Sequence, residues 1–247
     1  RRSHLRKLMK DLSPGLNSKK YLVCVPYAGG YSNSFLPLKN YLPKDIKLIS
    51  FDPPGHGPNL SPLVDNIDDL VNLYLMEMQP ILEGEVTLFG HSMGGIIVHR
   101  MAQILESKGI NPKNVIISAM NPPEIRRKTN HLDDKDFIDY IKSLGGLPDE
   151  VLQHQELLNY ILPVIRSDFR AIENYINDDT TLLKAPLYII SGTTDSNYTV
   201  KGAKKWVEWG NEVHFLIVNG GHMFLLHQAD IVGELIMKIL DRVKSVK

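Results

Sequence analysis

Short runs of apolar and β-branched residues alternate along this chain with longer segments whose apolar residues recur every three or four positions. The first pattern predicts buried strands, which we place at 21–26, 46–51, 85–90, 114–119, 186–191 and 213–218. The second predicts helices, which we place near 33–42, 66–82, 94–108, 199–209 and 229–244. Strands joined by helices of this length form βαβ units, so the expected fold is α/β, a mostly parallel sheet flanked by helices on both faces.

The interval 122–178 departs from this alternation, because no strand pattern occurs where the sheet would gain its next strand. It begins with two consecutive prolines and continues with amphipathic segments, which predict short helices near 133–144, 154–162 and 163–176. Such an insertion is either a helical lid over the carboxyl edge of the sheet or an elaborated crossover. Because α/β sheets bind ligands at that edge, we favour the lid.

Charge is distributed unevenly along the chain. The 247 residues carry 28 Lys and Arg against 28 Asp and Glu, so the formal net charge is zero with His neutral. Residues 1–20, however, hold seven of the basic residues and one of the acidic ones. We therefore expect a basic, disordered N-terminal arm over 1–20 and a single, mildly acidic domain over 21–247 that carries the lid insertion at about 122–178.

The composition also excludes several classes of protein. A chain without net charge is a poor partner for nucleic acid or an anionic membrane surface, and no apolar run reaches the roughly 18 residues of a membrane span. Cys24 is the only cysteine, so an intrachain disulfide is impossible, and we expect a cytoplasmic location. The sequence contains no metal-ligand cluster, P-loop or dinucleotide-binding motif, so we expect neither a metal nor a cofactor.

Residues 90–94 read Gly-His-Ser-Met-Gly and match the pattern G-x-S-x-G. The bare pattern carries little weight alone, but its surroundings suit a nucleophile. A strand pattern precedes it and a helix pattern follows it, which places Ser92 on a sharp strand-to-helix turn with small residues on both sides. The start of the helix adds unpaired N–H groups and a positive dipole end. We interpret Ser92 as the nucleophile of an α/β-hydrolase fold and not as a serine that merely caps the helix.

A nucleophilic serine needs a general base, and α/β-hydrolases carry their catalytic residues in the chain order Ser, acid, His. Among the nine histidines, His222 comes directly after a predicted strand and a Gly-Gly turn, which places its imidazole at the edge of the sheet. His99, in contrast, is expected on the surface of a helix. We therefore interpret His222 as the catalytic base.

The acid that orients the base is expected on a loop after a strand between these two residues. The strand at 186–191 is followed by such a loop, and this loop contains Asp195. The loop after the strand at 114–119 is a competing position, but it has no carboxylate before Glu124. We therefore interpret Asp195 as the residue that holds His222 in the correct tautomer and stabilises the imidazolium.

An oxyanion hole requires two backbone N–H donors. One is expected from Met93, which directly follows the nucleophile, and the other from the loop after the first predicted strand. That loop reads Pro-Tyr-Ala-Gly-Gly at 26–30, with Ala28 as the expected donor. An ordinary glycine turn has the same composition, so this prediction depends on the triad.

Four motifs stand in the order and at the spacing of a known family. They read Pro-Tyr-Ala-Gly-Gly at 26–30, Asp-Pro-Pro-Gly-His-Gly at 52–57, Gly-His-Ser-Met-Gly-Gly at 90–95 and Gly-Gly-His-Met-Phe-Leu at 220–225. Together with the lid-like segment 162–170, they resemble the type II (external) thioesterases of nonribosomal peptide and polyketide synthesis over nearly all of 21–240. Many members carry Arg where this chain has His56, and the likeness is closest to the surfactin-type subgroup, which is similar at that position.

The resemblance implies a stand-alone serine thioesterase that removes stalled or misprimed acyl groups from the 4′-phosphopantetheine arm of carrier proteins or domains. It implies acyl or peptidyl carrier domains of a synthase as partners, and no cofactor beyond the phosphopantetheine that the substrate carries. We expect a monomer with no nucleic acid or membrane partner. Two alternatives stay open from the residues alone: a carboxylesterase or lipase-like hydrolase, because a triad does not distinguish thioesters from oxygen esters, and a non-catalytic binding protein of the same fold.

Overall fold

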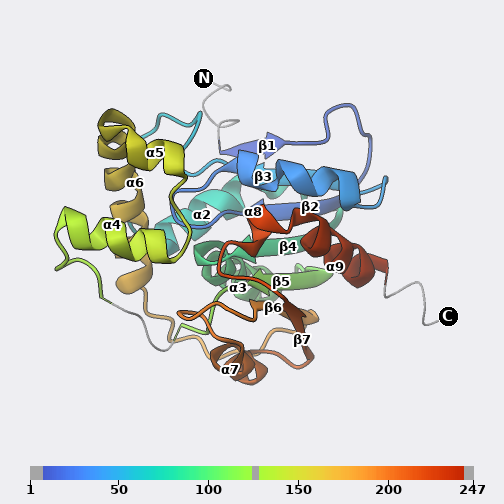
Figure 1. Cartoon of the computed structure of the whole chain (residues 1–247). Helices are drawn as coiled ribbons and strands as arrows, with labels where there is room; N and C mark the ends of the chain where they lie inside the picture. Colours follow the sequence, from blue (N-terminus) through green and yellow to red (C-terminus); the bar gives the residue numbers. More distant parts are fainter. Residues whose placement is uncertain (1–7, 124–127, 242–247) are drawn as a thin grey trace.

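A seven-stranded β-sheet forms the centre of the computed structural model (Figure 1), which describes residues 8–123 and 128–241. The strands lie in the order β1-β3-β2-β4-β5-β6-β7. Neighbouring strands are parallel throughout, except that β1 pairs antiparallel with β3. The strand bounds are β1 Met9–Asp11, β2 Lys20–Val25, β3 Lys47–Phe51, β4 Glu85–His91, β5 Asn114–Ser118, β6 Leu187–Gly192 and β7 Val213–Val218.

The six predicted strands, β2 to β7, are confirmed to within one residue at each end. Strand β2 shows why the apolar runs are uninterrupted. Successive side chains of a strand point to opposite faces of the sheet. Val23 and Val25 pack into one hydrophobic cluster, and Leu22 and Cys24 into another. Both faces are therefore buried, as expected for parallel strands covered by helices.

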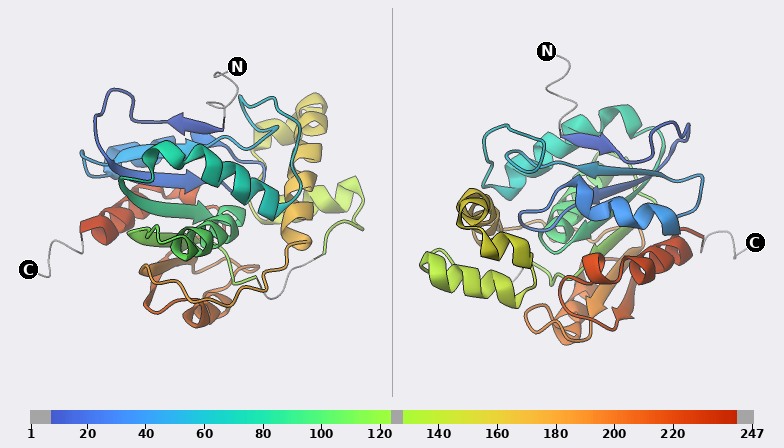
Figure 2. Two further views of the ribbon diagram at one scale, coloured as in Figure 1. Left: turned by 180° about the vertical axis from the view of Figure 1, so that it is seen from behind. Right: turned by 45° about the horizontal axis from the view of Figure 1, so that its top comes forward.

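Helices cover the two faces of the sheet. Helices α2 (Ile67–Glu77) and α3 (Met93–Ser107) pack on one face, which is turned toward the viewer in the left panel of Figure 2. The 3₁₀ helix η1 (Ser32–Tyr41) and helices α8 (Phe224–His227) and α9 (Ala229–Asp241) pack on the other (Figure 1).

Two of the predicted helices are each divided in the structure. The segment predicted at 66–82 consists of α2 and a short 3₁₀ helix η2 (Gln79–Ile81), which begins next to Pro80. The segment predicted at 199–209 consists of α7 (Val200–Ala203) and the 3₁₀ helix η3 (Lys204–Trp209).

Helices α4 (Asp134–Ser143), α5 (Asp149–Gln153) and α6 (Gln155–Glu173) occupy the interval between β5 and β6. They form a third hydrophobic cluster of their own and stand beside the sheet on the left of Figure 1. The predicted helix break before Pro163 is wrong, because α6 continues through it. Pro163 and Asn159, whose carbonyl loses its helical partner, are both exposed, so water can replace the missing hydrogen bond.

The prediction of a disordered arm over 1–20 is wrong for the part of this segment that the structure describes. Residues 1–7 lie outside the described part of the chain, but Met9–Asp11 form the edge strand β1. The Lys47 ammonium lies 2.7 Å from the Asp11 carboxylate and fastens this strand to β3. The domain therefore begins before the predicted boundary at residue 21. Strand β1 has only three residues, and they pair with β3 at the edge of the sheet.

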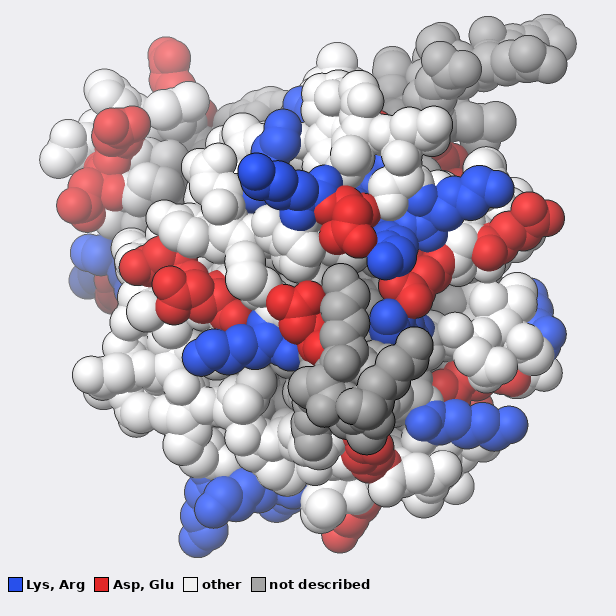
Figure 3. Space-filling view, turned by 90° about the vertical axis from the view of Figure 1, so that its right-hand side faces the viewer, with Lys and Arg blue, Asp and Glu red and all other residues white. Residues whose placement is uncertain are grey.

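Basic and acidic side chains are interspersed on the face shown in Figure 3, which lies on the side of the molecule away from helices α4, α5 and α6. This mixing agrees with the zero formal charge of the chain. Within 8–123 and 128–241, no helix is both long and apolar enough to cross a lipid bilayer.

Candidate active site

Ser92 lies between strand β4 and helix α3 and has φ +56° and ψ −119°. A residue with a side chain rarely adopts a positive φ, and holding it there costs on the order of 1–3 kcal/mol. Two backbone hydrogen bonds hold the turn: Ser92 N–H donates to the Ser118 carbonyl (2.7 Å), and Gly95 N–H donates to the Ser92 carbonyl (2.8 Å). The turn is therefore sharp and strained, as the sequence motif predicts.

The glycines on either side of Ser92 are required by close backbone contacts. A Cβ atom on Gly90 would overlap the backbone of Gly94, and a Cβ atom on Gly94 would overlap the carbonyl of Val25. Neither neighbour is a flexible side chain that can move aside. The glycines thus let β4, α3 and the end of β2 meet at the point where Ser92 is presented.

The three side chains predicted to act together meet at the carboxyl edge of the sheet. The His222 Nε2 atom lies 3.1 Å from the Ser92 Oγ atom, and the His222 Nδ1 atom lies 2.7 Å from the Asp195 Oδ2 atom. All three residues are buried. Ser92 follows β4, Asp195 follows β6 and His222 follows β7, so the parallel sheet aligns three loops from distant parts of the sequence.

The surroundings of Asp195 decide the tautomer of His222. The Asp195 Oδ1 atom accepts hydrogen bonds from the backbone N–H groups of Asn197 (3.2 Å) and Tyr198 (3.0 Å), which turns Oδ2 toward the imidazole. A carboxylate only accepts hydrogen bonds, so Nδ1 of His222 carries the proton. Nε2 is then free to accept the Ser92 hydroxyl hydrogen. The Tyr198 ring stacks on the His222 ring, with centroids 5.0 Å apart, and restricts its rotation.

His91 fixes the backbone of His222, a role that the sequence pattern did not predict. The His91 ring is fully buried, its Nε2 atom lies 2.9 Å from the His222 carbonyl oxygen and its Nδ1 atom lies 2.6 Å from the Ser118 Oγ atom. Because a carbonyl cannot donate, Nε2 carries the hydrogen and Nδ1 accepts from the Ser118 hydroxyl. Burial, aided by repulsion from His222, lowers the pKa of His91 to about 3, so this ring is neutral. The position of His91 in the Gly-His-Ser-Met-Gly motif, directly before Ser92, is the sequence feature that could have indicated this role.

The loop at 26–30 lies beside Ser92, and its shape is set by one turn. Gly30 N–H donates to the Tyr27 carbonyl (2.8 Å). The Tyr27 carbonyl and the Ala28 N–H belong to the same planar trans peptide and point in opposite directions. The turn therefore orients the Ala28 N–H, which is one of the two predicted oxyanion donors. The other predicted donor, Met93 N–H, is at the first position of α3, where helical N–H groups have no partner within the helix.

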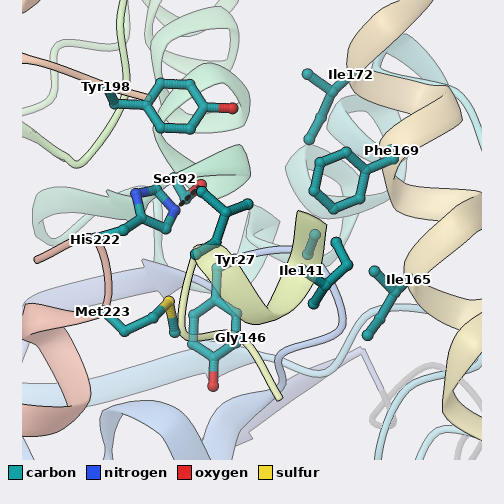
Figure 4. Close-up of a pocket in the computed structure, with 12 residues that line it drawn as sticks. Tyr27, Ser92, Ile141, Gly146, Ile165, Phe169, Ile172, Tyr198, His222 and Met223 are labelled. Carbon is teal, nitrogen blue, oxygen red and sulfur yellow. Dashed lines mark hydrogen bonds between the residues drawn. The ribbon is translucent and has the colours of Figure 1, made fainter. Parts of the chain in front are cut away.

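A small apolar pocket opens at Ser92 (Figure 4); its cavity volume is about 30 Å³, and the hollow reaches about 400 Å³ only when the space open to solvent is counted. Across the pocket, Ile141 from α4 and Phe169 and Ile172 from α6 face Ser92 and His222. Ala28 also lines the pocket. The apolar lining, rather than the present volume of the pocket, is suited to an aliphatic group attached to a carbonyl carbon next to Ser92.

The other candidates from the sequence lie elsewhere. The competing position for the acid, after β5, presents Asn121, which is not a carboxylate. The prediction that His99 lies on the surface is wrong, because it is fully buried against Trp206 and Trp209. Its neighbours come from η3, more than 100 residues later, and the helical pattern alone does not reveal them. In the described part of the chain, no three His, Cys, Asp or Glu side chains gather into a metal site.

The topology of the sheet, together with a strained serine turn after β4, defines the α/β-hydrolase class, and the predicted fold is confirmed. The family model described as "Thioesterase domain" matches residues 20–240. The chain therefore belongs to the thioesterase domain family and is a hydrolase that acts on thioesters.

Two relatives match this chain over most of their own length. The gramicidin S biosynthesis protein GrsT of Aneurinibacillus migulanus is 28% identical over 229 residues, which are 90% of each chain. The probable anguibactin biosynthesis thioesterase AngT of Vibrio anguillarum is 30% identical over 239 residues, 91% of this chain and 93% of AngT. The solved structure of YbtT, a type II thioesterase from the yersiniabactin NRPS/PKS pathway, has a TM-score of 0.84 and 28% identity, covering 94% of this chain and 97% of YbtT. The resemblance to the type II family is confirmed, whereas the closer likeness to the surfactin-type subgroup stays a prediction.

Proposed function

We propose that this protein hydrolyses acyl groups from the 4′-phosphopantetheine arm of carrier domains and so clears stalled or misprimed synthases of nonribosomal peptide or polyketide synthesis. Its relatives include thioesterases named for such pathways. The observation that carries the proposal is the hydrogen-bonded series Ser92–His222–Asp195 at the opening of an apolar pocket under the lid.

In the proposed acylation step, the Ser92 oxygen attacks the thioester carbonyl carbon while Nε2 of His222 takes the hydroxyl proton. The N–H groups of Ala28 and Met93 hold the resulting oxyanion. The C–S bond then breaks, and His222 gives its proton to the leaving thiolate. The products are an acyl ester of Ser92 and the free phosphopantetheine thiol.

Deacylation repeats these roles with water as the nucleophile. His222 takes a proton from water, which attacks the ester carbonyl, and the oxyanion again forms against the same two N–H groups. His222 then returns the proton to the Ser92 oxygen, which releases the carboxylic acid. Asp195 stays ionised in both steps, where it holds the tautomer and stabilises the imidazolium.

The remaining parts of the proposal concern the lid, the partners and the location. The insertion at about 122–178, of which 124–127 lie outside the described residues, shapes the acyl pocket and gates access of the carrier. Faster amide hydrogen exchange in α4–α6 than in the sheet, reduced by a bound carrier, is the expected result, and equal exchange in both would contradict gating. The partners are acyl or peptidyl carrier domains, and the protein acts as a cytoplasmic monomer.

The proposed role of Ser92 is tested by the Ser92→Ala variant and by labelling. Hydrolysis of an acyl-carrier thioester is expected to fall by at least about 10³-fold, because the nucleophile is lost. Phenylmethylsulfonyl fluoride is expected to modify the peptide that contains Ser92 and no other. Substantial turnover by the variant, or an adduct elsewhere, would refute the assignment.

The substrate class is tested separately, by turnover of acetyl- to long-acyl carriers beside turnover of nitrophenyl esters. Higher kcat/KM for the carriers is the expected result. A wide preference for oxygen esters would instead identify a carboxylesterase. Failure of a fluorophosphonate probe to label the folded protein would indicate a non-catalytic binding protein.

A further inference from the structure

Asp168, on lid helix α6, reaches across to the oxyanion loop although it takes no part in the triad. Its Oδ2 atom accepts a hydrogen bond from the Gly29 N–H (2.7 Å) and lies 2.6 Å from the Nε2 atom of His56. The side chains of Asp168 and His56 are 4% and 2% exposed, so water does not compete for these contacts. The lid, the loop at 26–30 and the loop after β3 thus meet at one carboxylate oxygen.

The contacts of His56 indicate the protonation state of its imidazole ring. The His56 Nδ1 atom lies 2.9 Å from the Pro54 carbonyl oxygen, which can only accept a hydrogen bond. Oδ2 of Asp168 already accepts from Gly29, so both ring nitrogens of His56 are placed to donate, as only the imidazolium can. Burial by itself lowers the pKa of His56, but the charge and hydrogen bond of Asp168, with the Pro54 carbonyl and Asp52, outweigh it and raise the pKa.

Two other titratable groups surround the pair. The Asp52 carboxylate favours the imidazolium electrostatically, and its Oδ1 atom accepts from the Ser32 N–H (2.9 Å). The Tyr74 hydroxyl is buried, and burial together with Asp168 and Asp52 raises the pKa of this phenol well above its usual value. Tyr74 is therefore neutral over the working pH range and leaves His56 as the group that titrates.

The bond from Asp168 acts on the peptide next to the predicted oxyanion donor. Gly29 has φ +81°, and a Cβ atom there would lie 2.8 Å from the Ile165 side chain of α6. The Gly30–Tyr27 hydrogen bond orients the peptide that carries the Ala28 N–H, and the Asp168–Gly29 bond orients the following peptide. With the planes on both sides of the Ala28 Cα held, the Ala28 N–H has little freedom to turn away.

We propose that Asp168 and His56 are positioning residues, which orient the Ala28 N–H toward the oxyanion by fastening the oxyanion loop to lid helix α6. This inference rests on the proposed function in that it takes Ser92 as the nucleophile. It also makes the oxyanion hole dependent on the lid, because α6 carries Asp168 and cannot move away from the loop without breaking the Gly29 bond.

The pair gives the activity a defined pH dependence. A histidine whose pKa is raised in the folded protein contributes its stabilisation fully below about pH 6.5 and loses it as the pH rises through the raised pKa. Neutral His56 has a single N–H and cannot donate to both Pro54 and Asp168. Reactions that need the oxyanion hole therefore slow at alkaline pH.

The test compares Asp168→Asn, His56→Gln and His56→Arg with Asp134→Asn. Asp134 is the matched control, because it is an exposed lid aspartate that pairs with Arg166 at 3.0 Å and does not touch the loop. Arginine stays charged at all accessible pH values, so His56→Arg keeps the cation and removes its titration. Each protein is measured as kcat and KM on an acyl-carrier thioester, and as the rate constant of Ser92 labelling by a fluorophosphonate, from about pH 6 to about pH 10.

We expect Asp168→Asn and His56→Gln to lower both kcat and the labelling rate constant by about 10- to 100-fold with little change in KM, since one oxyanion donor is worth about 10²–10³-fold. Asp134→Asn is expected to match the unaltered protein, and His56→Arg to retain activity without the alkaline decline. Rates for Asp168→Asn equal to those of Asp134→Asn, or the same alkaline decline in His56→Arg, would overturn the proposal.

A measurement on the unaltered protein tests the proposal even if the variants do not fold. Imidazole nitrogen NMR is expected to show His56 doubly protonated well above pH 6.5, and a neutral ring at pH 7 would overturn the proposal. Fluorophosphonate labelling needs no carrier. Slower labelling of Asp168→Asn in a protein that hydrolyses no carrier thioester would therefore refute the proposed function and keep this inference.

Discussion

His91 and His99 are both fully buried, and burial lowers the pKa of each to about 3, yet their surroundings differ. His91 uses both ring nitrogens, one toward Ser118 and one toward the His222 carbonyl. In the described structure, neither ring nitrogen of His99 has a hydrogen-bond partner. A neutral imidazole always carries one N–H, so His99 bears a desolvation cost that no hydrogen bond in the described structure offsets.

His99→Leu is therefore expected to make the protein less sensitive to acid. When a histidine is neutral in the folded protein, only the unfolded chain takes up a proton as the pH falls from about 6.5 toward 3. The free energy of unfolding then decreases by about 1.4 kcal/mol per pH unit. The variant removes one such group and is expected to be at least as stable at pH 7. Urea unfolding between about pH 7 and pH 4.5 measures this, with the exposed His131→Leu as control. An unchanged pH dependence in His99→Leu would contradict the prediction.

Single residues also show how far the site is predictable. Ser92, Asp195 and His222 were predictable because each directly follows a strand pattern, and parallel strands bring such loops to one edge. Asp168 was not, because it lies within an amphipathic helix, where an isolated aspartate is usually solvated. Its burial depends on His56 and Gly29, which are 112 and 139 residues distant in the chain.

At the scale of elements, the approach of α3 to β2 depends on Gly94. The Cβ atom of an alanine there would overlap the Val25 carbonyl. Because the overlap is with the backbone of β2 and not with a side chain, no change of rotamer can relieve it. We expect Gly94→Ala to lose at least about 3 kcal/mol of unfolding free energy, at the upper end of overpacking costs. Gly15→Ala is the control, since φ is +85° but the surrounding space is open, and it is expected to lose only about 1–2 kcal/mol. Equal losses in urea unfolding would refute the close-approach argument.

Ile172 of helix α6 is buried in the wall of the pocket beside Ser92, where we propose that the acyl group binds. Ile172→Ala is expected to raise kcat/KM for longer acyl carriers relative to acetyl by about tenfold, because the added space accepts further methylenes. It is also expected to cost about 2–5 kcal/mol of stability.

Ile176→Ala makes the same chemical change at a side chain that is 75% exposed, and we expect it to alter neither quantity. A chain-length profile for Ile172→Ala that matches the profile of Ile176→Ala would show that the acyl group does not reach this wall of the pocket.

The elements themselves were largely predictable. Strand and helix patterns are local, so β2 to β7, α2, α3 and α9 were recognised from apolar spacing. The continuity of α6 through Pro163 was not predictable. It depends on solvent reaching the exposed Asn159 and on the hydrophobic cluster that α6 forms with α4 and α5.

At the scale of the whole molecule, the N-terminal segment belongs partly to the sheet. Removal of residues 1–7 is expected to leave the unfolding free energy unchanged, because every described contact of β1 remains. Removal of residues 1–17 takes away β1 and its ion pair with Lys47, so we expect a loss of about 1–3 kcal/mol. Urea unfolding measures both, and equal stability of the two truncated proteins would show that β1 does not stabilise the sheet. Carrier affinity is expected to be unchanged in both.

The sequence by itself determined the order of strands and helices, the serine turn and the three residues of the candidate triad. Each of these depends on neighbours a few positions away, or on the rule that parallel strands end at a common edge. The tertiary structure alone decided which distant segments meet. It formed the apolar pocket, buried His99 and brought Asp168 of helix α6 to His56 and the loop at 26–30. These features arise where side chains from distant segments pack together and exclude water. The type of a residue does not by itself indicate which residues of other segments will contact it.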